Sequence, residues 1–534
     1  MNISFDKKII LFLLICLLIY FQGILRLPVM DRDEARFATA SKTMLIEKEY
    51  IDIKMVDEKR YKKPIGIYWS QILSNLAFGS YPYDKIWVYR LPSLIGIFAG
   101  LLLAFFMLRN FDNKNTAFLT VFFLVCSILT ISEAHQSKTD GLLFFFVSLC
   151  NLIIYKMIQS KNLSYLEKLT FWISFALGIL IKGPIIFIFI IFPLISFSII
   201  KKKNFLKDFW ITSGFMIFIL ISVPWFIAIN IKSGGLFWAE SIGNDLLNKV
   251  KSGQESHGFP PGYYTLLLFL FFWPGSIFVI SLINNLKSNL KKIKQSDNLT
   301  YYLIISFLLP FLFFEIIPTK LPHYIYPSYL PLSFLISRNI IKLKFKEESI
   351  KFALIPLIIF PISIVTLIIA SIIQFSNYDI VLIFMVITLL IFIVFLIFLE
   401  IKKKIKNLIM ATGFFQLSVY FLLIFFLIPR LEVLWVSNKI NNIISEHENY
   451  VERVFTIGFN EPSLLFLTSH KSSNSLKNLR KDQIFNEKIL LIITEKSNKN
   501  LRENRNYSSF KLIGEFNGFN YSRGENIKFK VYKN

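Results

Sequence analysis

The sequence feature that most constrains the fold is a series of apolar runs, each close to the length that crosses a lipid bilayer. A transmembrane helix needs about 20 mainly apolar residues. Thirteen such runs occur, near residues 9–29, 87–108, 116–132, 140–158, 167–181, 184–200, 209–229, 263–283, 300–317, 323–341, 352–374, 380–400 and 408–429. They predict a mainly α-helical, polytopic membrane protein folded as a helix bundle.

Composition excludes the main soluble alternatives. A soluble chain of 534 residues would form several domains, but 54% of the residues are hydrophobic, which is typical of membrane proteins. The formal net charge of +24 suggests a nucleic-acid partner at first sight. Because the lysines cluster in short loops between apolar runs, we expect lipid head groups as anionic neighbours and no nucleic acid.

The same lysine clusters predict the orientation of the chain. Residues 201–207, 287–294 and 402–406 are lysine-rich and fall on one side of the predicted bundle. Lysine-rich short loops face the cytoplasm. We therefore expect a multi-pass protein of the inner (plasma) membrane, with a cytoplasmic N-terminus and residues 30–86 and 231–262 on the periplasmic side. The first run lacks a small-residue cleavage site and is interpreted as a retained anchor.

Two domains are predicted. Residues 1–429 form the transmembrane domain, in which 30–86 is the first periplasmic loop with interfacial helices, and residues 430–534 form a small soluble α/β domain. Thirteen is an odd number of spans, so the C-terminal domain is also expected in the periplasm. Short β-like runs occur there at 451–459, 489–495 and 526–533. A helix is expected to begin at Glu461-Pro462, as a structural cap or as a binding contact.

The periplasmic loops carry acidic residues at predicted helix starts. Asp33 and Glu34 lie in the first turn of an amphipathic helix over 33–48, with Arg36 one turn on. A helix cap needs one carboxylate, yet Asp31 adds a third acid within four residues. Asp140 begins a predicted span on the same side of the membrane, where an ionisable group is a functional candidate or a solvated cap.

Three lysines precede prolines at predicted helix starts on the same side. They are Lys63, Lys182 and Lys320. Helix N-termini attract anions, and an adjacent lysine adds a full charge, so these ends resemble a phosphate-binding site. His323, near Lys320, would support the phosphate or cap a span. The alternative is that the lysines snorkel toward the membrane interface.

The second long periplasmic loop contains the Gly- and Pro-rich segment GQESHGFPPGYY at 253–264. Glu255, His257 and Tyr263 offer hydrogen-bonding and stacking groups that would hold a sugar or an acceptor. A plain connector is the alternative, and a lone histidine is weak evidence for a metal. The cysteines Cys16, Cys126 and Cys150 lie within apolar runs without metal-type spacing.

Together these motifs resemble the GT-C membrane glycosyltransferases, in particular the bacterial aminoarabinose (lipid A) transferases and the protein O-mannosyltransferases. The resemblance covers residues 1–340 well and rests on DRDEARFATASKTML, KKPIGIYW, TDG, KGP, GQESHGFPPGYY and PTKLPHYIYP in this order. It implies a sugar donor on a polyprenyl phosphate and transfer on the periplasmic face to lipid A, a polysaccharide, another glycolipid or a protein. The resemblance implies that Asp33 and Asp140 correspond to catalytic acids of the family, with Glu34 and Arg36 as members of the same catalytic set. It also implies that Lys63 and Lys182 lie near the lipid phosphate. The relatives often have an acid where this chain has Lys62.

The chemistry of such a transfer fits the residues. A hydroxyl acceptor must lose a proton as it attacks the anomeric carbon, which requires a carboxylate base such as Asp33. The departing phosphate needs cations rather than an acid. One displacement without a covalent intermediate inverts the anomeric centre. We expect no metal or other cofactor, although Asp31 and Asp33 form a D-x-D pair. A proton-coupled transporter or polyprenyl-lipid flippase is the alternative, which would favour ionisable residues at the membrane midplane.

Overall fold

The computed structural model describes residues 5–160, 162–251, 258–343, 354–376, 379–402, 404–447, 451–468, 472–473, 488–502 and 510–534. Within these ranges, eight helices are long and apolar enough to cross a membrane, and two bent helix pairs raise the number to as many as ten. The eight are α1 (Phe5–Arg26), α4 (Ile86–Phe111), α7 (Asp140–Ser160), α11 (Thr212–Ser233), α16 (Asn298–Ile316), α18 (Leu354–Phe375), α19 (Ile380–Ile401) and α20 (Ile405–Leu422). The chain is a multi-pass membrane protein with the predicted mainly helical fold.

The predicted number of thirteen spans is not confirmed, because several apolar runs are short or bent. Segment 116–132 divides into α5 (Lys114–Cys126) and α6 (Ile128–Ala134), which meet at 64° where Ser127 caps the second helix. Segment 263–283 bends by 117° around Pro274. The remaining helices of the bundle are α8 (Tyr165–Lys182), α9 (Ile185–Phe189), α10 (Ile191–Lys201), α12 (Leu236–Trp238), α13 (Asn248–Lys251), α14 (Tyr263–Phe271), α15 (Val279–Ser296) and α17 (Tyr329–Lys342).

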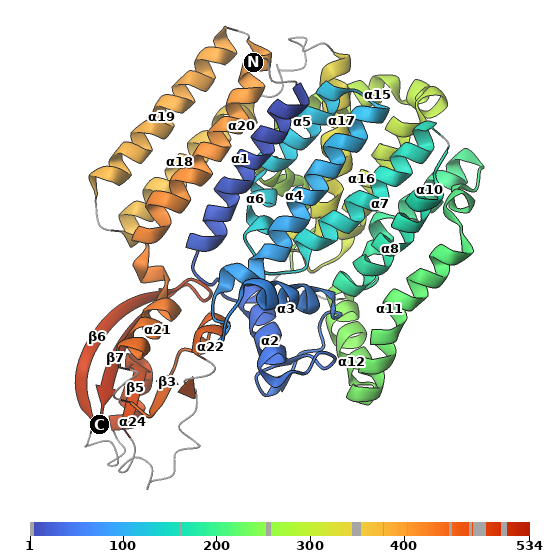
Figure 1. Cartoon of the computed structure of the whole chain (residues 1–534). Helices are drawn as coiled ribbons and strands as arrows, with labels where there is room; N and C mark the ends of the chain where they lie inside the picture. Colours follow the sequence, from blue (N-terminus) through green and yellow to red (C-terminus); the bar gives the residue numbers. More distant parts are fainter. Residues whose placement is uncertain are drawn as a thin grey trace.

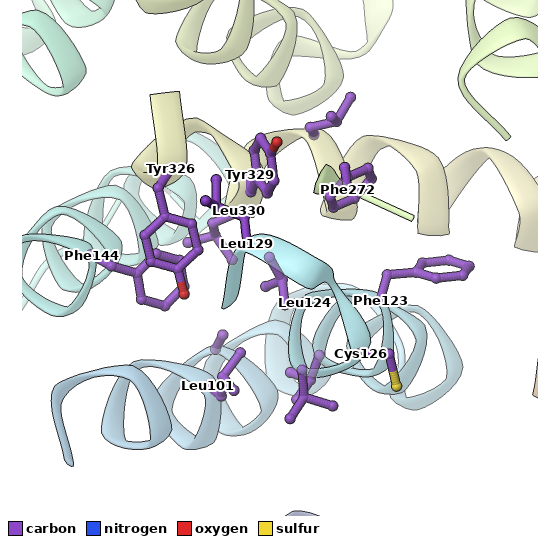
Figure 2. Close-up of a cluster of buried hydrophobic side chains, with 14 of the residues drawn as sticks. Leu101, Phe123, Leu124, Cys126, Leu129, Phe144, Phe272, Tyr326, Tyr329 and Leu330 are labelled. Carbon is purple, nitrogen blue, oxygen red and sulfur yellow. The ribbon is translucent and has the colours of Figure 1, made fainter. Parts of the chain in front are cut away.

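The apolar core of the bundle lies where α4, α5, α7 and α17 meet. Figure 2 shows Leu101, Leu124 and Leu129 packed between these helices. Phe144 of α7 stacks on Tyr326 with ring centroids 4.7 Å apart. Fully buried rings and aliphatic chains of this kind fix the start of α7, which carries one of the predicted acids, against the segment that precedes α17.

One end of the bundle carries additional structure. α2 (Asp33–Glu47), α3 (Gly66–Phe78) and α12 lie at the end where α20 leads into the C-terminal domain, whereas α1 begins at the opposite end (Figure 1). Between α2 and α3 the chain forms a short antiparallel hairpin of β1 (Lys54–Met55) and β2 (Glu58–Lys59). Most residues of α2 are buried, because the C-terminal domain and α3 pack against it.

The C-terminal domain is built on a five-stranded sheet with strand order β4-β3-β5-β7-β6. The predicted β-like runs correspond to β3 (Arg453–Ile457), β5 (Ile489–Thr494) and β7 (Glu525–Lys533), and α22 (Pro462–Thr468) begins at the predicted proline. β6 (Lys511–Asn520) escaped prediction because its glycines and asparagines are typical of loops. The other elements are β4 (Ser472–Ser473), α21 (Val436–His447) and α24 (Glu495–Arg502).

A close backbone approach joins the segment between α1 and α4 to α8. A Cβ atom at Gly66 would lie 2.7 Å from the carbonyl oxygen of Leu180. Gly66→Ala is therefore expected to lower the free energy of unfolding by about 1–3 kcal/mol through overpacking, seen as a lower thermal midpoint in detergent. Gly514→Ala is the control, because a Cβ there meets nothing within 4 Å. Equal midpoints for the two variants would contradict the prediction.

Candidate active site

A cavity of about 600 Å³ opens at the end of the bundle that carries α2 and α3. Its lining combines six cationic side chains, three carboxylates and a large apolar wall. The ionisable groups of the lining are Asp33, Arg60, Lys62, Lys63, Lys138, Asp140, Lys182, Asp245, Lys249, His323 and Tyr324. The apolar wall comes mainly from α8 through α12 and from the end of α16. Five residues predicted from the sequence therefore line the same cavity. They are Asp33, Lys63, Asp140, Lys182 and His323.

Asp33 is the first residue of α2, and its side chain is 44% exposed. Burial raises the pKa of this carboxyl, but the nearby charges of Lys138 and Arg60 outweigh burial and hold it below its usual value. Arg36 adds a further cation, with Nη1 3.9 Å from Asp33 Oδ1. Asp33 is consequently an ionised, solvent-accessible carboxylate at neutral pH, able to accept a proton from a ligand.

Asp140 begins α7, as predicted, and its side chain is buried. Its Oδ1 lies 2.5 Å from Nζ of Lys182, the last residue of α8. The next residue, Gly141, lets α7 approach α4 closely, since a Cβ there would lie 2.7 Å from the Cα of Ser93. Asp140 is thus fixed in place and paired with a cation.

Lys138 connects this pair to His323. Its Nζ lies 3.1 Å from Oε1 of Glu133 and 3.3 Å from Nδ1 of His323. Burial would lower the pKa of Lys138, but Glu133 and Asp140 outweigh it and raise the pKa above its usual value. Because an ammonium group only donates, His323 accepts at Nδ1 and is neutral, with its proton on the Nε2 that faces Asp140.

A second group of charges in the cavity lining surrounds Asp245. Lys63 Nζ is 2.5 Å from Oδ2 of Asp245, and Lys249 Nζ is 2.7 Å from Oδ1 of the same carboxylate. Burial lowers the pKa of Lys63 to about 8 despite Asp245. Burial alone would raise the pKa of Asp245, but the two lysines lower it to about 2. Each lysine binds one oxygen of the Asp245 carboxylate, and the same pair is suited to binding two oxygens of a phosphate.

Three of the predicted site residues lie beside the cavity rather than in its lining. Glu34 is fully buried and forms a two-point ion pair with Arg90 of α4, at 2.8 and 2.7 Å. Lys320 is also fully buried, and its Nζ donates to the carbonyl of Glu315, 2.7 Å away, at the end of α16. Arg36 contacts the cavity through its ion pair with Asp33.

The predicted sugar-binding loop contributes less to the described site. Tyr263 stacks on Phe259 with ring centroids 4.7 Å apart and is not among the lining residues. Glu255 and His257 lie outside the described residues. The two acids of the D-x-D pair have different surroundings. Asp33 lines the cavity, whereas Asp31 accepts a hydrogen bond from the backbone N–H of Ser463, 3.1 Å away in the C-terminal domain. In the described ranges, no three His, Cys, Asp or Glu residues gather as a metal site would require.

Sequence reasoning missed Arg60, Asp245 and Lys249 of the lining and the buried Arg90. Asp245 and Lys249 did carry a signal, since they are an acid and a lysine one helical turn apart in the loop 231–262, which the sequence predicts to be periplasmic. Arg90 lies near the start of a predicted span, where an ionisable residue marks a constrained position.

Part of this chain matches a known protein family. Residues 62–227 match the family described as dolichyl-phosphate-mannose-protein mannosyltransferase. Undecaprenyl phosphate-alpha-4-amino-4-deoxy-L-arabinose arabinosyl transferase 2 of Proteus mirabilis is 24% identical over 57% of this chain and 54% of its own length. The corresponding transferase of Wigglesworthia glossinidia brevipalpis is 28% identical over 65% of this chain and 60% of its own length. The chain thus spans little more than half the length of these relatives.

Solved structures extend the likeness to the whole fold. The crystal structure of ArnT from Cupriavidus metallidurans bound to undecaprenyl phosphate superposes with a TM-score of 0.76 and 15% identity, covering 99% of this chain and 98% of that one. The apo state of ArnT gives a TM-score of 0.74. The predicted resemblance is confirmed: the chain has the fold of the GT-C membrane glycosyltransferases, and its residues 62–227 match the dolichyl-phosphate-mannose-protein mannosyltransferase family.

Proposed function

We propose that this chain is a glycosyltransferase that moves a sugar from a polyprenyl-phosphate donor to a hydroxyl or phosphate group of an envelope lipid, glycan or protein. One observation carries the proposal: a single cavity combines an ionised, accessible carboxylate, a group of lysines and an apolar wall. A lipid-linked sugar phosphate has the same three parts in complementary form, namely a polar sugar, an anionic phosphate and a long apolar chain.

The donor would lie along the cavity with its phosphate at the lysines. Lys63, Lys182 and Lys249 supply three cations, and Phe187, Phe192 and other apolar side chains offer the prenyl chain a continuous surface. The relatives support this donor class, since they are named undecaprenyl phosphate-alpha-4-amino-4-deoxy-L-arabinose arabinosyl transferases and the crystal structure of ArnT has undecaprenyl phosphate bound.

The reaction would be a single displacement. The acceptor oxygen attacks the anomeric carbon, its proton passes to Asp33, and the bond from that carbon to the phosphate oxygen breaks. The lipid phosphate leaves with the bonding electrons, and the lysines stabilise its added charge. Asp140 would act by holding Lys182 in the cavity, through a 2.5 Å contact. No covalent intermediate forms, so the anomeric configuration inverts; product with retained configuration would contradict this step.

The orientation of the protein follows from the charge of its loops. The lysine-rich connection between α19 and α20 lies at the bundle end opposite α2 and the cavity (Figure 1). Lysine-rich loops face the cytoplasm. The cavity and the C-terminal domain would therefore face the periplasm, and the protein would reside in the inner membrane.

The transporter alternative receives no comparable support. Glu315 is its nearest candidate for a proton-carrying acid, but this side chain accepts hydrogen bonds from the backbone N–H groups of Tyr264 and Thr265, both at 3.1 Å. It therefore caps the start of α14, a structural role.

The function is tested by reconstituting the protein with polyprenyl-phosphate sugars and a cell-envelope lipid extract. Mass spectrometry is expected to show a glycosylated acceptor and free polyprenyl phosphate. Movement of the intact donor across the bilayer without a new glycosidic bond would instead support a flippase. Unchanged donor on both sides would reject both functions for the tested sugars.

The lowered pKa of Lys63 predicts a pH dependence. Lys63 is charged below its pKa of about 8 and neutral above it, so its contribution to donor binding is present at lower pH and lost as the pH rises through about 8. We expect kcat/KM for the donor to fall over that range. Arginine stays charged over this range, so in Lys63→Arg we expect kcat/KM for the donor to fall only at a higher pH. Superimposable pH profiles for the two proteins would remove Lys63 from the donor site.

A further inference from the structure

The C-terminal domain reaches the residues that directly precede Asp33. The hydroxyl of Tyr521 accepts a hydrogen bond from the backbone N–H of Asp31, 2.8 Å away. The Asp31 carboxylate accepts from the N–H of Ser463 at 3.1 Å, and Arg32 Nη2 donates to the carbonyl of Ser522 at 2.7 Å. We name Ser463, Tyr521 and Ser522 the docking surface.

The docking surface is itself held together. Ser463 belongs to the first turn of α22, whereas Tyr521 and Ser522 lie in the turn between β6 and β7. Glu461 joins the two elements, because it accepts hydrogen bonds from Asn520 at 2.8 Å and from Arg523 at 3.2 Å. The docking surface therefore presents its groups to Asp31 and Arg32 as one unit.

The segment that the docking surface contacts has a strained backbone. Arg32, the N-cap residue of α2, has a φ of 67° and a ψ of −119°. Such a conformation is unfavourable for a non-glycine residue and persists only where surrounding contacts impose it. Asp33, the first residue of α2, directly follows Arg32. A change of the backbone conformation at Arg32 would therefore move the Asp33 carboxylate that lines the cavity.

We propose that the C-terminal domain positions Asp33, with Tyr521 and Asp31 as positioning residues that act through the strained Arg32. The proposal rests on the proposed function for its kinetic consequence, because it assigns the domain a part in the transfer reaction. A carboxylate base is effective only within hydrogen-bond reach of the acceptor. Loss of the docking contacts would therefore lower the rate of the chemical step without weakening donor binding.

Tyr521→Phe tests the proposal with a minimal change, since it keeps the ring and removes the hydroxyl. We expect kcat to fall by about 5–20-fold with KM for the donor unchanged, because a shift of about 1 Å at a reacting group costs up to about 100-fold. Lys42→Met is the control. It removes another contact between α2 and the C-terminal domain, the 2.8 Å hydrogen bond from Lys42 to the carbonyl of Phe466, and is expected to keep kcat within about twofold.

A double variant separates action through Asp33 from a general effect. In the Asp33→Asn background, Tyr521→Phe is expected to cause no further loss, since groups that act as a unit are not additive. A wild-type rate in Tyr521→Phe, an equal loss in Lys42→Met, or a full further loss in the double variant would each overturn the proposal.

Hydrogen exchange supplies a readout independent of activity. Tyr521→Phe is expected to raise exchange of the amides of residues 31–36 and to leave β5 of the sheet unchanged. Unchanged exchange at 31–36 would contradict the positioning role even in a protein that transfers no sugar. Raised exchange in a protein without transferase activity would instead count against the proposed function alone.

Discussion

Asp33→Asn is expected to lower kcat for sugar transfer by about 10²–10⁴-fold, which is the usual contribution of a general base. Asparagine has nearly the same shape but cannot take the acceptor's proton. Asp33 is available for this part, because nearby cations keep it ionised and its side chain remains accessible from the cavity. KM for the donor is expected to change little, since the phosphate contacts lie at the lysines.

The matched control is Asp57→Asn, which changes an exposed aspartate in the same segment between α1 and α4 that is not part of the cavity lining. It should transfer sugar at the wild-type rate. Initial rates of both purified variants, with folding checked by size-exclusion chromatography, provide the comparison. Normal transfer by a folded Asp33→Asn variant would remove Asp33 from the mechanism.

Glu34→Ala is expected to lower the free energy of unfolding by about 3–5 kcal/mol. Arg90 is fully buried, and removing one partner of a buried ion pair leaves the other charge uncompensated. Glu34 also accepts hydrogen bonds from the backbone N–H groups of Met30 at 2.8 Å and Ser137 at 3.1 Å. Its loss would therefore loosen both the start of α2 and the loop that carries Lys138.

Glu47→Ala is the control for that experiment. Glu47 lies at the other end of α2 in an exposed pair with Lys54, 3.4 Å apart, and such pairs contribute at most about 1 kcal/mol. Thermal unfolding in detergent should show a large drop in midpoint for Glu34→Ala and little change for Glu47→Ala. Similar midpoints would contradict the structural role of Glu34. Loss of activity in a fully stable Glu34→Ala variant would favour a direct part in catalysis.

The sequence predicted the helix starts well, because their signals are local. α2 begins at Asp33, α7 at Asp140 and α22 at Pro462, each at the acid or proline that marked it. The sequence named Asp33 as the base but did not show that the neighbouring Glu34 points away from the cavity. Which of them faces the cavity is decided by Arg90, 56 positions away along the chain.

For the lysines, too, the sequence predicted the motif but not the direction of the side chain. Lys63, Lys182 and Lys320 share one local pattern, a lysine just before a proline, yet Lys320 turns back to donate to carbonyls at the end of α16. Lys249 carries no such pattern and reaches the cavity through its pairing with Asp245. Local sequence indicates where a helix begins, whereas the direction of a side chain depends on how distant helices pack.

The central claim is that one cavity holds the lipid phosphate beside Asp33, and the most direct test is a cryo-EM structure of the protein in a lipid nanodisc with undecaprenyl phosphate. We predict density for the phosphate within hydrogen-bond reach of Lys63, Lys182 or Lys249, with the prenyl chain along the apolar wall formed by α8 through α12. Lipid density at another surface, or a phosphate at the lysine-rich end of the bundle, would contradict the account.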